Sequence, residues 1–78
     1  MFTFNTLRAM YRGAWPSERV FVETRFGTKA YILVPDEGDE SVDVIDVVYG
    51  ALLEGVKPQE VKWAEVRAWS RHSAGGST

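Results

Sequence analysis

The length, composition and charge of the chain exclude several classes of protein. Its 78 residues allow one domain, and a hydrophobic content of 45% with 13% aromatic residues is too high for a disordered protein. The absence of cysteine rules out disulfides and a cysteine nucleophile, and it favours a cytoplasmic location because small secreted domains are often cross-linked. No apolar run approaches the ~18 residues of a membrane-spanning helix, so we expect no membrane partner.

The net charge of −2 is distributed unevenly along the chain. Residues 36–54 contain seven acidic residues and no lysine or arginine, whereas the segments before and after are mildly basic. An acidic block between two basic ones predicts separate charged patches on the folded surface.

The first predicted element is a helix over residues 4–14. Its apolar residues recur at helical spacing, with arginines on the flank. Gly13 near its end and Pro16 just beyond it are residues that stop helices. The apolar stripe consists of Phe4, Leu7, Tyr11 and Trp15.

Residues 19–34 predict a β-hairpin, because apolar and polar side chains alternate over much of the segment. The pair Gly27-Thr28 fits a two-residue turn with glycine first. Such a turn sets a register in which Val22 pairs with Leu33, so we expect these two side chains on the same face of the hairpin.

Residues 41–54 are predicted to form a second helix, although many of them are β-branched. Asp43, Asp46 and Glu54 fall at helical spacing, whereas a strand would place the two aspartates on opposite faces. Acidic residues near the start suit the positive end of a helix dipole. We expect this helix to bury Ile45, Val48, Tyr49 and Leu52.

The last element, residues 60–70, has two interpretations. Its apolar residues scatter around a helical wheel, but in a strand Trp63, Arg67 and Trp69 share one face, so we predict a strand. The fold class is then α+β, with the order α-β-β-α-β and both helices packed on a three-stranded antiparallel sheet. Residues 1–72 form this single domain, and residues 73–78 form a flexible C-terminal tail.

The sequence lacks the residue constellations of common catalytic and metal sites. The one histidine, His72, stands beside the small-residue tail with no partner to orient it. The acidic run over residues 35–43 lacks the ligand spacing of a calcium loop, and there is no phosphate-binding loop. Asp43 and Asp46 suit the exposed stripe of a helix better than an acid–base pair. We therefore expect no enzymatic activity, no cofactor and no metal.

Two surfaces are candidate partner-binding sites. An acidic surface would attract a basic partner, such as the groove of a nucleic-acid-binding complex, or would serve only solubility. A surface of interleaved tryptophan and arginine would stack on a partner, or its tryptophans would instead be core residues under the first helix. The acidic surface comprises Asp36, Glu37, Asp39, Glu40, Asp43 and Asp46, and the aromatic and basic surface comprises Trp63, Arg67 and Trp69.

These features favour a non-catalytic protein-interaction module, such as a regulator or inhibitor that docks on a larger protein. In size and lack of cysteine the chain is like many small proteins of phages and mobile elements, although no motif supports that origin. A homodimer through a sheet edge is a further expectation. The alternatives are a structural or assembly protein and a nucleic-acid-binding protein that uses the Arg/Trp face, and the acidic pI of ≈ 5.3 counts against nucleic acid.

Overall fold

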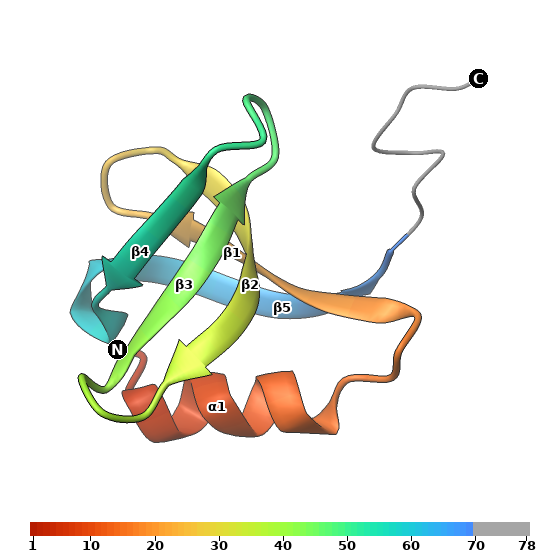
Figure 1. The fold of residues 1–78 in the computed structure, drawn as a ribbon, viewed down its shortest axis with the longest axis horizontal. Helices are drawn as coiled ribbons and strands as arrows, with labels where there is room; N and C mark the ends of the chain where they lie inside the picture. The colour runs from red at the N-terminus through yellow and green to blue at the C-terminus, as the bar shows by residue number, and fades with distance from the viewer. Residues whose placement is uncertain (70–78) are drawn as a thin grey trace.

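The computed structural model describes residues 1–69, which contain one α-helix and five strands (Figure 1). The end of the predicted domain, His72 and the predicted tail lie outside these residues. The elements in chain order are α1 (Phe4–Gly13), β1 (Glu18–Thr24), β2 (Lys29–Asp36), β3 (Ser41–Asp46), β4 (Leu52–Val56), the 3-10 helix η1 (Pro58–Glu60) and β5 (Val61–Ala68).

The five strands form one antiparallel sheet in the spatial order β4-β3-β2-β1-β5. The two edge strands are consecutive in the chain, and only residues 57–60 separate them. The five Cα–Cα steps from Val56 to Val61 span at most about 18 Å, and η1 shortens this path, so the sheet has to curl until β4 and β5 approach each other at one end. Figure 1 shows the resulting open barrel, with α1 packed beneath the strands.

The predicted first helix is confirmed as α1. Thr3 caps its start, because the Thr3 hydroxyl accepts a hydrogen bond from the backbone N–H of Thr6 at 3.1 Å. Leu7 is fully buried, and Phe4 is 8% exposed. Trp15 follows the helix instead of extending its apolar stripe, and it is 71% exposed.

The predicted hairpin is confirmed as β1 and β2, but its predicted register is wrong. Val22 lies opposite Ala30, three residues before Leu33. Because side chains alternate between the two faces of a strand, this odd shift exchanges the faces of β2. Ile32 therefore points into the core, and Leu33 is 46% exposed.

The register changed because the turn contains three residues, 25–27, and not the predicted pair. The backbone N–H of Thr24 donates to the carbonyl of Thr28 at 2.9 Å, which closes the turn. Gly27 takes the third position with a φ of 88°, a left-handed conformation that glycine adopts at no steric cost. The Thr24 hydroxyl also accepts the N–H groups of Phe26 and Thr28, so this side chain holds the longer turn in place.

The predicted second helix over residues 41–54 does not form. The segment folds as β3, a turn over residues 47–51 and β4, so the sheet has five strands instead of three and one α-helix packs on it instead of two. Val42 and Val44 decide this outcome, because both are fully buried on the inner face of β3. Their β-branched side chains pack well on a pleated sheet and lose freedom in a helix.

The burial predicted for that helix is wrong as well. Val48, Tyr49 and Leu52 are exposed by 71%, 83% and 50%, and Ile45 is half-buried. The aspartate spacing that suggested a helix has a different cause. Asp46 closes the β3–β4 turn, since its carboxylate accepts the N–H of Val48 at 2.7 Å and that of Tyr49 at 3.0 Å.

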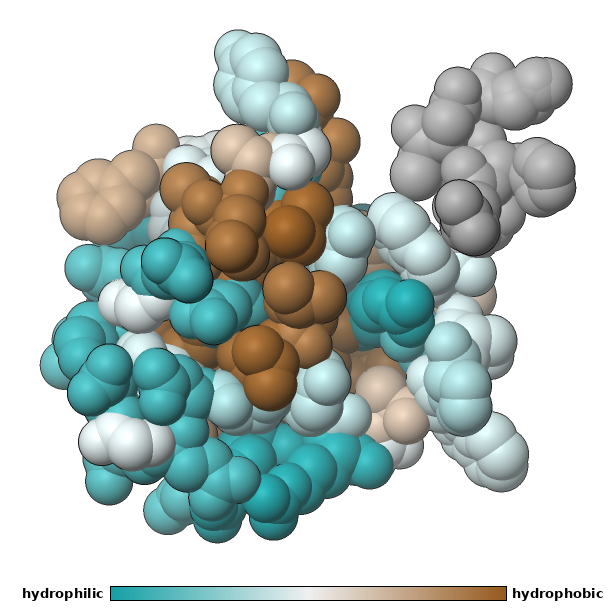
Figure 2. All heavy atoms as spheres, in the orientation of Figure 1, coloured by the Kyte–Doolittle hydropathy of each residue, from teal (hydrophilic) through white to brown (hydrophobic). Residues whose placement is uncertain are grey.

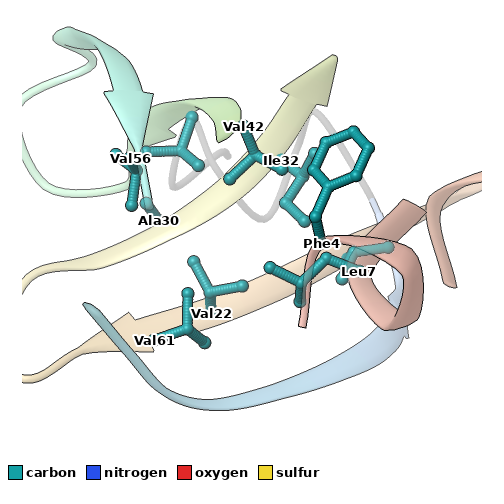
Figure 3. Packing of buried hydrophobic residues seen from close by; sticks show 10 residues of the cluster. Phe4, Leu7, Val22, Ala30, Ile32, Val42, Val56 and Val61 are labelled. Atoms are coloured by element: carbon teal, nitrogen blue, oxygen red, sulfur yellow. The ribbon is translucent and has the colours of Figure 1, made fainter. Parts of the chain in front are cut away.

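The predicted last strand is confirmed as β5, which pairs with β1 along its length. The core lies between the inner face of the curled sheet and α1, and Figure 3 shows Phe4 and Leu7 of the helix beside the inward side chains of the strands. Ser41 is fully buried there, and its hydroxyl has no hydrogen-bond partner within residues 1–69. No helix in this part of the chain is long and apolar enough to cross a membrane.

Candidate partner-binding surface

The acidic residues of the β2–β3 turn, 36–40, are partly neutralised by α1. The Glu37 carboxylate binds Arg8 at 3.0 Å and Arg12 at 2.6 Å, and both arginines project from the helix. The Asp36 carboxylate accepts the N–H of Gly38 at 3.1 Å and so stabilises the turn. Asp39 and Glu40 are exposed beside these two residues in sequence.

The two remaining acidic candidates, Asp43 and Asp46, do not share an exposed helical face, because that helix is absent. The Asp43 carboxylate accepts the N–H of Gly55 on the neighbouring strand at 3.1 Å, and Asp46 caps the β3–β4 turn. Both carboxylates thus hold backbone geometry. The structure does not bring the six predicted acidic residues into one surface.

The face of the sheet that points away from α1 carries a row of apolar side chains across four strands. Phe21 of β1 lies opposite Tyr31 of β2, Tyr31 lies opposite Ile45 of β3, and Ile45 lies opposite Leu52 of β4. The outer face of an antiparallel sheet is usually polar. Figure 2 shows hydrophobic side chains gathered over the β3–β4 hairpin, whereas hydrophilic side chains cover the end of the molecule where α1 lies.

Three aromatic rings form a cluster at one end of this row. The ring centroids of Tyr31 and Trp69 are 4.8 Å apart, and Phe21 lies 6.0 Å from Tyr31 and 6.1 Å from Trp69. These tilted arrangements lie in the range that aromatic pairs favour. The backbone fixes Trp69 as well, because its N–H donates to the carbonyl of Ser17 at 2.7 Å.

Arginine side chains extend the cluster on both sides. The Arg67 guanidinium lies 5.2 Å from the ring centre of Phe21 and 5.4 Å from that of Trp63, and Arg19 lies 5.7 Å from the ring centre of Trp69. The predicted residues Trp63, Arg67 and Trp69 are therefore together on one face. The two tryptophans are half-buried on the outer face and do not belong to the core under α1.

A hollow of about 670 Å³ opens beside the ring cluster. Phe21, Tyr31 and Ile45 line it, together with the β3–β4 turn over residues 47–50 and the end of β5 over residues 67–69. These lining residues place it between the tip of the β3–β4 hairpin and the C-terminal end of β5. We call it the aromatic hollow.

Sequence reasoning missed half of this surface. The predicted register, with Val22 and Leu33 on one face, also puts Tyr31 on the core face, because Tyr31 and Leu33 are two residues apart in the strand. Val48 and Tyr49 were predicted to lie on the buried face of a helix that does not form. The available signal was the apolar run before Gly50, which has a φ of 69° and marks a turn.

Within residues 1–69, no group of three or more His, Cys, Asp or Glu side chains is placed to hold a metal ion. The Arg67 side chain is paired with Glu65, and Trp63 donates its ring N–H to Glu23 at 2.7 Å. Comparisons with protein-family models, curated proteins and solved structures gave no match.

Proposed function

We propose that this protein is a non-catalytic protein-interaction module, a small regulator or inhibitor that docks on a larger protein through the aromatic hollow. The observation that carries the proposal is the apolar row with its ring cluster on the outer face of the sheet. Contiguous apolar surface of this kind marks interaction sites, because water solvates it poorly. Aromatic and arginine side chains are also the commonest binding hot spots. The absence of cysteine favours a cytoplasmic setting.

A protein partner fits this surface better than a nucleic acid. Affinity for nucleic acid depends on several clustered cations that are free to contact phosphates. Arg67 at the hollow is paired with Glu65, and Arg19, which lies over the Trp69 ring, donates to the backbone carbonyls of Pro16 and Glu18. Both guanidinium groups lie over aromatic rings of the cluster. The net charge of the chain, −2, also disfavours binding to phosphates. The hollow therefore suits an apolar side chain of a protein partner.

The test is partner capture from the native cell with the tagged full chain, followed by affinity measurement with the purified partner. The informative variant is Tyr49→Ala, because this ring is 83% exposed at the rim of the hollow and its loss leaves the core intact. We expect the Kd to rise by about thirtyfold, as for the loss of an aromatic anchor worth about 2 kcal/mol.

The matched control is Phe26→Ala. Phe26 is also an aromatic residue in a hairpin turn and is 80% exposed, but it does not line the hollow. Equal binding by the two variants, or recovery of no partner protein, would contradict the proposal. Submicromolar binding of nucleic acid at about 150 mM salt would support the Arg/Trp alternative instead.

A further inference from the structure

Strand β5 is an edge of the sheet, and within residues 1–69 no strand pairs with its outer side. The N–H of Trp69 donates to Ser17, so in this regular antiparallel ladder the odd-numbered residues direct their backbone groups to β1. The even-numbered residues direct theirs to the open edge. These residues are Ala64, Val66 and Ala68.

We propose that β5 pairs antiparallel with β5 of a second copy, around a twofold axis at Val66. In this arrangement the N–H and carbonyl of Val66 bond to the carbonyl and N–H of Val66 in the second copy. In the same way, the backbone groups of Ala64 in each copy bond to those of Ala68 in the other copy. The five-stranded sheets of the two copies then form one continuous sheet through a self-complementary contact.

Charge complementarity selects this register. On the outer face, the axis at Val66 places Glu65 opposite Arg67 of the second copy, and it does so twice by symmetry. It also places Trp63 opposite Trp69 of the second copy. Opposite charges and aromatic pairs across neighbouring strands are stabilising. A twofold axis at residue 65 would place Glu65 of one copy opposite Glu65 of the other, and an axis at residue 67 would do the same with Arg67. Like charges directly opposite each other are destabilising.

Two of the features that prevent pairing of edge strands, a bulge and a proline, are absent from the central part of this edge. Over residues 63–68 the ladder with β1 is regular, without a bulge, and the segment contains no proline. Val66 is 39% exposed although its side chain is on the inner face opposite Val20. In the paired arrangement each Val66 covers the other. The proposal rests on the β5 edge, which also contributes Arg67 and Trp69 to the lining of the aromatic hollow, and its test needs only the purified chain.

The first test is sedimentation of the full chain across micromolar to millimolar concentrations, with charge-reversal variants. Wild-type protein should form dimers. Glu65→Arg alone and Arg67→Glu alone should each raise the dimer Kd by more than about tenfold, because like charges then face each other. An equimolar mixture of the two variants should recover association, since one partner carries two arginines and the other two glutamates. This recovery also excludes misfolding as the cause of the losses.

The second test fixes the register with single cysteines, which are clean probes because the chain contains no cysteine. Val66→Cys should form a disulfide between copies, because directly paired residues have Cα atoms about 5.5 Å apart. Ala68→Cys should not, since two residues 68 would be about 14 Å apart, four residues along the strands. A monomer at millimolar concentration, no recovery in the mixture, or equal cross-linking of the two cysteine variants would overturn the proposal.

Discussion

Truncation of Leu7 tests whether α1 packs on the sheet as described. The side chain is fully buried between the helix and the strands. Leu7→Ala removes three carbon atoms, which are worth about 2.4 kcal/mol at about 0.8 kcal/mol per buried CH₂. The cavity left behind raises the expected loss to about 3–5 kcal/mol. A domain of 78 residues has a free energy of unfolding of about 4–12 kcal/mol, so this variant should be at or near the limit of folding.

Leu52→Ala is the matched comparison, because it makes the same chemical change at a residue that is 50% exposed. Leu52 buries about half of its side chain, so its truncation should cost about 1.2 kcal/mol, half of the burial free energy lost at Leu7. A surface position also leaves no closed cavity. The helix predicted from sequence over residues 41–54 would have buried Leu52 and made the two losses similar. The ratio of the two losses therefore distinguishes the five-stranded sheet from that helix.

The assay is equilibrium unfolding in urea, monitored by tryptophan fluorescence. An unchanged m-value shows that unfolding is still two-state. We expect Leu7→Ala to lose at least twice as much free energy of unfolding as Leu52→Ala. Equal losses would refute the placement of β4. A loss below about 1 kcal/mol for Leu7→Ala would refute the packing of α1. Both variants are measured at several protein concentrations, so that self-association does not contribute to the comparison.

Four further substitutions test three local features by the same unfolding assay. Gly27→Ala should lower the free energy of unfolding by about 1–2 kcal/mol, because Gly27 has a positive φ. Its control is Gly13→Ala, which is equally free of steric contact and should raise the free energy of unfolding by up to about 1 kcal/mol. Equal effects of the two substitutions would contradict the three-residue turn. Ser41→Ala should leave stability unchanged or raise it by about 1 kcal/mol, because a buried hydroxyl without a partner is removed; a clear loss would indicate a bonded hydroxyl. Glu37→Gln should cost at most about 1 kcal/mol, and high salt should abolish the difference from wild type; a salt-independent loss would count against an exposed ion pair.

The sequence predicted the elements in which one periodicity dominates. The helical stripe with Leu7 identified α1, and strict alternation identified the hairpin and β5, together with the shared face of Trp63, Arg67 and Trp69. Period-two alternation predicted that face because it depends only on the strand itself. The half of the hollow contributed by β2 and β3 depends on the pairing of strands, and that pairing was predicted wrongly.

The errors have two local causes. Asp43 and Asp46 stand three residues apart because each accepts a backbone N–H at a different place, and this spacing coincides with one helical turn. The β-branched residues around them were the better guide, since they fit a buried strand. In the hairpin, glycine occupies the last position of the turn instead of the first, and that single difference reverses the faces of β2.

The order of strands in the sheet has a consequence for how the chain folds. The pairs β1–β2, β2–β3 and β3–β4 are hairpins of neighbouring segments, whereas β1–β5 joins residues near opposite ends of the chain, such as Glu18 and Ala68. Closing this long loop costs more chain entropy than closing any hairpin, so it should limit the folding rate. During synthesis β5 leaves the ribosome after the other four strands, and until then one edge of β1 has no partner. The four-stranded meander that precedes β5 is therefore the stage at which a nascent chain is most exposed to pairing with the wrong strand.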